Sequence, residues 1–142
     1  MAANDDNLVA ALGGLYREVN AFYGAIARDF GLTAQQIALL CQVKDERPTF
    51  GELASSLGCD KTNITGMVDR LERRGYVARQ PDPEDRRISR VALTAQGVTA
   101  GNDIRAAIAE KLAAQLPQFA RIELAAAAAD LVAALSDRGG SN

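Results

Sequence analysis

The sequence has no histidine and no tryptophan, and only Cys41 and Cys59 carry thiols. Because histidine is the usual general base and the commonest metal ligand, its absence argues against hydrolytic and zinc-dependent chemistry. Two cysteines cannot fill a tetrahedral zinc site, and a cytosolic pair is expected to stay reduced. A Gly-rich phosphate loop and a nucleophile motif are also missing. The sequence therefore predicts neither an enzyme nor a bound metal or other cofactor.

Long apolar runs are missing as well, since none approaches the roughly 20 residues needed to cross a membrane. Residues 1–6 lack the basic segment of a secretory signal. We therefore expect a cytoplasmic protein with no membrane partner. The 142 residues, of which 48% are hydrophobic and 24% charged, are typical of one globular domain.

The net charge of −2 conceals a polarised distribution. Residues 61–90 contain eight lysines or arginines and five carboxylates, a local charge of +3, so the remainder carries −5. A basic segment on an acidic body attracts phosphates locally, although the acidic body should lower non-specific affinity. This distribution predicts an orientation-dependent and salt-dependent interaction with a polyanion.

Residues 49–75 have the pattern of a helix-turn-helix. Thr49 begins a capping box, with glutamate three residues later, that starts a helix over residues 50–57. After a short turn, Asp60 is a good N-cap for a second helix over residues 61–74. A glycine follows each helix, as is typical of helix ends. Two short helices joined by such a turn indicate a helix-turn-helix.

The second of these helices has two unlike sides. Its apolar residues recur at helical spacing and predict a face that packs on the core. The residues that we expect to face DNA are Lys61, Thr62, Asn63, Thr65, Gly66, Arg70 and Arg73. Asparagine can bond adenine edges in the major groove, and threonine can meet phosphate or a thymine methyl. Gly66 costs about 1 kcal/mol relative to alanine in mid-helix, which close backbone approach explains better than packing. The alternative is an ordinary exposed helix surface.

A hairpin with a charged tip follows. Residues 76–79 and 88–93 are the two limbs; the second alternates like a half-buried strand, and prolines 81 and 83 are expected to prevent regular pairing across the tip. Arg86 and Arg87 could enter a narrow minor groove, with Asp85 holding one guanidinium in a bidentate pair. The alternative is a solvated loop with incidental charge.

Four segments in unbroken order, residues 60–65, 68–79, 81–87 and 93–97, resemble the winged-helix core of the MarR family of transcription regulators, and residues 32–36 fit the same family. The resemblance implies an obligate homodimer that binds a pseudo-palindromic operator on double-stranded DNA and usually represses transcription. It also implies that Thr62, Asn63, Thr65 and Arg70 lie in the major groove, and that Asp85 and Arg87 form the wing tip. Gly66 departs from the family, where many members have arginine or another larger side chain.

The remaining segments predict a mainly α fold with about six helices and a small β-hairpin wing, in one domain over residues 1–142. Residues 33–93 would form the winged helix-turn-helix, and residues 5–30 and 95–137 the dimerisation helices, intertwined with those of the partner. Apolar rows along residues 5–30 are wide enough for two neighbours, one of them in the second subunit. A single helix buried within one subunit is the alternative.

The family resemblance further implies an effector pocket, often for phenolic or other lipophilic anions, whose ligand changes the spacing of the two reading helices and releases the DNA. Tyr16, Tyr23 and Cys41 are candidates for its lining, with core packing as the alternative for each. Two other hypotheses stay open. Oxidation of Cys59, beside a helix N-terminus, could replace the ligand as trigger, or the winged helix could bind protein instead of DNA.

Overall fold

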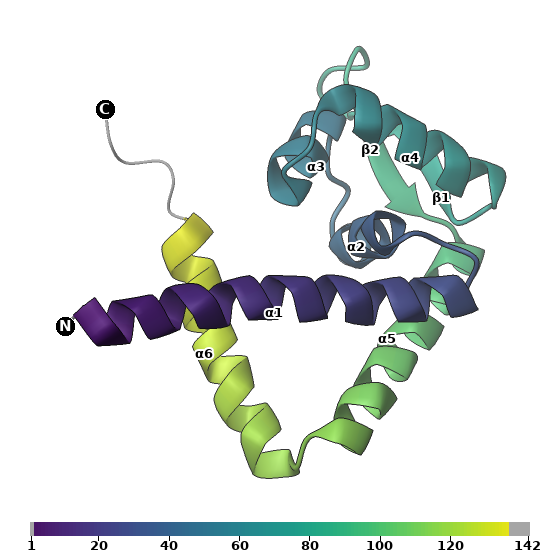
Figure 1. Cartoon of the computed structure of the whole chain (residues 1–142). Coiled ribbons are helices and arrows are strands. Elements are labelled where there is room, and N and C mark those ends of the chain that lie inside the picture. Colours follow the sequence, from purple (N-terminus) through teal and green to yellow (C-terminus); the bar gives the residue numbers. More distant parts are fainter. Residues whose placement is uncertain (1, 137–142) are drawn as a thin grey trace. The chain divides into compact units, whose positions relative to one another are not determined.

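The computed structural model describes residues 2–136 and has six helices and one β-hairpin (Figure 1). The elements are α1 (Ala2–Asp29), α2 (Ala34–Val43), α3 (Phe50–Leu57), α4 (Lys61–Arg73), β1 (Val77–Pro81), β2 (Ser89–Leu93), α5 (Ala95–Gln115) and α6 (Gln118–Ser136). The expected fold class, mainly α with a hairpin wing, is confirmed. The polar tail at 137–142 lies outside the described residues. The chain divides within α5, after Arg105, into two compact units.

The helix starts predicted at Thr49 and Asp60 are present, and Thr33 adds a third. Thr33 and Thr49 each form a complete capping box with the residue three positions later. Asp60 caps α4, its carboxylate accepting the N–H of Asn63 at 2.8 Å. Gly58 ends α3 with a φ of 65°, a left-handed conformation that glycine adopts without strain. The helix-turn-helix is therefore specified by local hydrogen bonds.

The core of the first unit surrounds α2, which lies beside α1, α3 and β2 (Figure 1). Every element from the end of α1 to the start of α5 contributes a fully buried side chain. These include Ile26, Ile37, Leu40, Leu53, Ile64, Leu71, Val77, Val91 and Ile104. The apolar face of α4, the helix expected to face DNA, therefore packs on the core of the first unit.

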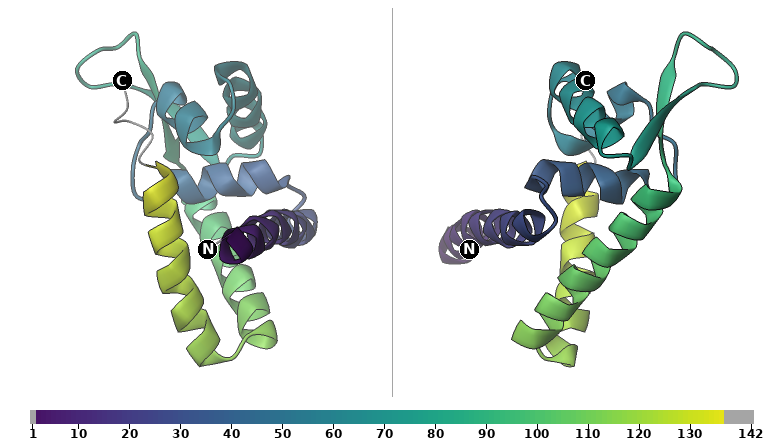
Figure 2. Two further views of the ribbon diagram at one scale, coloured as in Figure 1. Left: turned by 60° about the vertical axis from the view of Figure 1, so that its left-hand side comes forward. Right: turned by 90° about the vertical axis from the view of Figure 1, so that its right-hand side faces the viewer.

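The two strands form an antiparallel hairpin, with Val77 opposite Leu93 at one end and Pro81 opposite Ser89 at the other. The prediction that prolines would prevent pairing here is wrong for Pro81. Within the described residues β1 has a single partner strand, and an edge strand tolerates a proline whose nitrogen the ladder does not need. The hairpin tip extends past α3 and α4 (Figure 2).

Packing of β2 also differs from the expected alternation. Val91 and Ala92 are both buried, although they face opposite sides of the strand. Ala92 has little surface to cover, and it lies opposite Ala78. On the other edge of β2, the N–H of Val91 donates to the Pro48 carbonyl at 2.9 Å. The segment before α3 thus extends the hairpin by one short pairing.

Most of the large apolar side chains of α1 are exposed. Its buried residues, Ile26 and Ala27, lie near the C-terminal end. The exposed ones are Leu8, Val9, Leu12, Leu15, Tyr16 and Val19. These residues therefore have no cover within the first unit.

The second unit comprises the rest of α5 and α6, joined by a turn at Leu116 and Pro117. Arg121 closes this turn by donating to the Leu116 carbonyl at 2.6 Å. No residue of α6 is buried, and Phe119, Ile122 and Val132 are more than 60% exposed at 68%, 64% and 63%. None of the helices described within residues 2–136 is long and apolar enough to cross a membrane.

Candidate nucleic-acid interface

The polar residues predicted to face DNA occupy the side of α4 away from the core. Its apolar row, Ile64, Met67, Val68 and Leu71, is buried. Lys61, Thr62, Asn63, Thr65, Arg70 and Arg73 are all exposed. The Thr65 hydroxyl donates to the Lys61 carbonyl at 2.9 Å. Because this bond uses the hydroxyl hydrogen, the Thr65 oxygen is left to accept hydrogen bonds.

Gly66 has no packing role within the described part of the chain. A Cβ atom built on it would meet nothing within 4 Å. An alanine would fit there and would favour the helix by about 1 kcal/mol. The glycine therefore leaves a shallow place in the middle of the polar face of α4.

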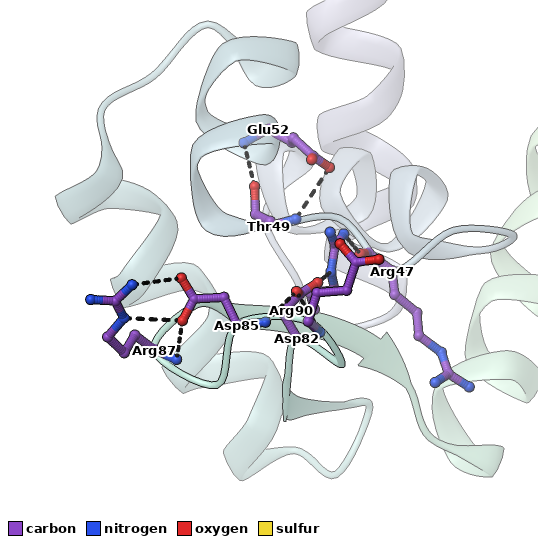
Figure 3. Close-up of polar contacts among 8 residues, drawn as sticks. Arg47, Thr49, Glu52, Asp82, Asp85, Arg87 and Arg90 are labelled. Atoms are coloured by element: carbon purple, nitrogen blue, oxygen red, sulfur yellow. Dashed lines mark hydrogen bonds and ion pairs between the residues drawn. The ribbon is translucent and has the colours of Figure 1, made fainter.

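The wing tip is held by a carboxylate–guanidinium pair (Figure 3). Arg87 donates through Nε to Asp85 Oδ1 at 3.0 Å and through Nη2 to Oδ2 at 3.1 Å. The predicted bidentate pair is thus present. The hydrogen bonds from Arg87 lower the pKa of the Asp85 carboxyl. Because the Arg87 side chain is 90% exposed, its charge is oriented without being buried.

Asp82 organises the base of the wing, a role that the sequence analysis missed. It is only 8% exposed and accepts the N–H groups of Glu84 at 3.0 Å and Asp85 at 2.9 Å. Arg90 donates to the same carboxylate through Nε and to the Arg47 carbonyl at 2.7 Å (Figure 3). The hydrogen bond from Arg90 does most to hold the pKa of Asp82 below its usual value, and the bond from the Asp85 N–H comes next. An aspartate between two prolines is a typical turn signal and could have indicated this role.

A second missed contact connects the wing to the helices. Arg79 on β1 forms an ion pair with Asp69 on α4. The Arg79 guanidinium also lies over the ring of Phe50, 5.4 Å from its centre. The ion pair thus holds the hairpin against α4, and the ring contact holds it against α3.

Of the three effector-pocket candidates, the structure brings two together. Tyr23 and Cys41 line a cavity of about 460 Å³ between α1 and α2, together with Asn20, Ala34, Gln35, Ala38 and Gln42. Tyr16 is 73% exposed, two helical turns away on α1, and is not among the lining residues. Burial raises the pKa of Tyr23 and that of the Cys41 thiol, an effect that Arg105 opposes at Cys41. Both groups are therefore uncharged at neutral pH. Cys59 lies half-buried in the turn between α3 and α4.

The family model that matches this chain is that of the MarR family, over residues 32–89. Two curated relatives are similar in sequence. An HTH-type transcriptional regulator, YcgE of Bacillus subtilis, is 41% identical over 76 residues, covering 52% of this chain and 49% of the relative. The HTH-type transcriptional repressor NicR of Pseudomonas putida is 37% identical over 83 residues, covering 58% and 52%. The chain thus spans about half the length of the curated relatives it matches.

A solved structure extends the likeness of fold over most of the chain. Wild-type MarR of Escherichia coli, in its apo form, superposes with a TM-score of 0.73 at 23% identity, covering 88% of this chain and 96% of that one. The match includes elements on both sides of the helix-turn-helix. It identifies the six helices and hairpin as a winged-helix fold of this type.

Proposed function

Because the chain belongs to the MarR family of transcription regulators, we propose that it binds double-stranded DNA sequence-specifically and controls transcription from a pseudo-palindromic operator. The observation that carries this proposal is the pairing, in one unit, of an exposed polar helix face with a pre-organised arginine at a wing tip. The helix face and the wing arginine both lie in residues 61–90, the basic segment of an otherwise acidic chain. A protein-binding winged helix would not need either.

In this proposal α4 enters the major groove. Thr62, Asn63 and Thr65 lie in its first two turns, where the N-terminal residues of a recognition helix contact base edges. Lys61, Arg70 and Arg73 are placed to meet phosphates, which fix register without reading sequence. Gly66 lets the DNA approach the helix backbone. The open space over its Cα supports this role.

Arg86 and Arg87 supply the second contact, in the adjacent minor groove. A narrow minor groove concentrates negative potential and attracts arginine. Asp85 holds the Arg87 guanidinium by two hydrogen bonds, so less side-chain entropy is lost when DNA binds. Asp82 and Arg90 support the tip from below. Asp85 and Asp82 thus serve to position Arg87 and Arg90.

We propose that the functional unit is a homodimer. The uncovered apolar rows of α1 and α6 are typical of a surface that a second copy of the chain buries. Two recognition helices about 34 to 36 Å apart would then reach successive major grooves on one face of the duplex. The dimerisation helices α1, α5 and α6, which together we call the dimer base, would set this separation.

We further propose that the protein represses transcription until a small lipophilic or phenolic effector binds. The cavity beside Tyr23 and Cys41, at about 460 Å³, has the volume of a small-molecule site. Its Tyr23 hydroxyl and Cys41 thiol are neutral, which suits a largely apolar ligand. Such a ligand releases DNA only if it binds the non-binding arrangement more tightly.

Selection of binding sites from random duplex DNA tests the function directly. The purified protein should enrich a palindromic site whose half-sites lie about one helical turn apart. Enrichment of a single half-site would contradict the dimer while keeping DNA recognition. If no sequence is enriched over competitor DNA at physiological salt, the proposed function is wrong.

A further inference from the structure

The segment that follows α4, residues 74–76, contacts two other helices at once. Arg74 caps the C-terminal end of α4 and reaches back to the end of α1. Its Nη1 donates to the Gly31 carbonyl at 2.7 Å, and its Nη2 donates to the Phe30 carbonyl at 3.1 Å. Carbonyl groups at a helix C-terminus carry partial negative charge, so a guanidinium is a favourable partner for them.

The end of α1 is shaped to receive this side chain. Gly31 adopts a φ of 67°, and the N–H of Leu32 returns to the Ala27 carbonyl at 2.9 Å, which closes the helix and turns both carbonyls outward. A Cβ atom on Gly31 would lie 3.2 Å from Arg74 Nη1. The guanidinium therefore lies directly against the glycine. It also lies 5.5 Å from the centre of the Tyr76 ring.

The start of α5 contacts the next two residues of the same segment. Thr94 donates through its hydroxyl to the Gly75 carbonyl at 2.5 Å and through its N–H to the Tyr76 carbonyl at 3.0 Å. The backbone of Gly97 passes the same Tyr76 carbonyl at a distance that leaves no room for a Cβ atom. The end of α1 and the start of α5 are thus both hydrogen-bonded to residues 74–76, which follow α4.

We propose that residues 74–76 are the joint through which the dimer base sets the position of the recognition helix, with Arg74 as its positioning residue. The inference rests on the proposed function, because it assigns a role in operator spacing. Arg74 need not touch DNA for this role. Its planar fork holds two carbonyl groups in fixed directions, which a lysine ammonium cannot reproduce. Removing the fork should leave the helix-turn-helix folded and basic but free to shift relative to α1.

The test measures spacing preference instead of affinity alone. The wild-type protein and Arg74→Lys are titrated against duplexes carrying the selected half-sites at the optimal spacing and with one or two base pairs inserted or removed. We expect Arg74→Lys to reduce the affinity ratio between optimal and altered spacing by about twofold to thirtyfold, the range that substitutions in a coupling path produce. Because the charge is kept, the salt dependence of binding should not change.

Two further variants make the result decisive. Arg28 is an exposed residue near the C-terminal end of α1. Arg28→Lys makes the same chemical change outside the joint and should keep the wild-type spacing ratio. Thr94→Val removes the hydroxyl that donates to the Gly75 carbonyl and accepts the Gly97 N–H at 3.0 Å, so it loosens the start of α5 at the joint. It should relax spacing as Arg74→Lys does, so the inference remains testable if Arg74→Lys fails to fold. An unchanged ratio in both joint variants would overturn the inference. Failure of the wild-type protein to select any duplex would instead refute the proposed function.

Discussion

The backbone of Gly97 passes so close to Tyr76 that a Cβ atom at position 97 would lie 1.9 Å from the Tyr76 carbonyl oxygen. The same oxygen accepts the Thr94 N–H. A helix therefore begins in direct contact with the backbone that leaves the recognition helix. The glycine at position 97 is required by this contact, since its neighbour is backbone and cannot rotate away.

Gly97→Ala should therefore destabilise the fold by about 1 to 3 kcal/mol, as overpacking of a rigid site does. Urea denaturation followed by circular dichroism measures this as a lower midpoint. Gly101→Ala is the matched control, because the nearest atoms to a Cβ there are those of the Arg105 guanidinium, at an ordinary contact distance of 3.7 Å. The control should be neutral or slightly stabilising. Equal stability of Gly97→Ala and wild type would contradict the close contact.

Gly66→Ala should have opposite effects on folding and on DNA binding. The position is open, so alanine should stabilise the helix by up to about 1 kcal/mol. If DNA approaches the backbone here, the added methyl group should weaken operator binding. Denaturation and a binding titration on the same preparation measure the two effects. Affinity that stays the same or rises would remove Gly66 from the interface.

Arg87→Ala should weaken operator binding by about 1 to 3 kcal/mol and reduce the dependence of log K on log salt by about one charge. The physical reason is the loss of one guanidinium that Asp85 holds toward solvent. Binding isotherms at several salt concentrations measure both quantities. Arg28→Ala removes the same charge from α1 and should leave the slope unchanged. Identical slopes for Arg87→Ala and wild type would exclude the wing from DNA contact.

The helices could be predicted from the sequence because their signals are local. Thr33, Thr49 and Asp60 cap helices through bonds that span three residues, and the Asp85–Arg87 pair spans two. Spacing in the chain is enough to suggest such contacts.

Apart from the turn that Asp82 closes, the missed contacts join residues of different segments of the fold. The carbonyl partners of Arg74 lie 43 and 44 positions away, and that of Arg90 lies 43 positions away. The Asp69–Arg79 pair depends on how the hairpin folds back on α4. The pairing of Pro81 was mispredicted for a similar reason, because tolerance of a proline depends on which edge of the strand is free. These contacts follow from tertiary packing and have no periodic signal.

Asp82→Asn should destabilise the wing at neutral pH and should matter less in acid. Arg90 and two backbone N–H groups lower the pKa of Asp82 in the folded protein, whereas the pKa of an aspartate in an unfolded chain is about 3.9. The ionised carboxylate therefore stabilises the fold above about pH 4, and this contribution is lost as the pH falls through the lower, folded pKa. Unfolding curves of wild type and variant between pH 7 and acid should converge. A difference in stability that is independent of pH would show that the charge of Asp82 is not what supports the tip.

Leu12→Asp should convert the dimer into a monomer, because a carboxylate cannot be buried cheaply in an apolar interface. Leu12 belongs to the uncovered row of α1 and contributes nothing to the buried core of the first unit. The helix-turn-helix should therefore keep its fold, while the affinity for the full operator falls to that for one half-site. Sedimentation at micromolar concentration measures the mass, and circular dichroism checks the fold. Asn7→Asp adds the same charge to α1 on the row that continues to Glu18, away from the apolar residues, and should stay dimeric. A dimeric Leu12→Asp variant with wild-type operator affinity would place the subunit contact elsewhere and would leave the spacing role of residues 74–76 without its connection through α1.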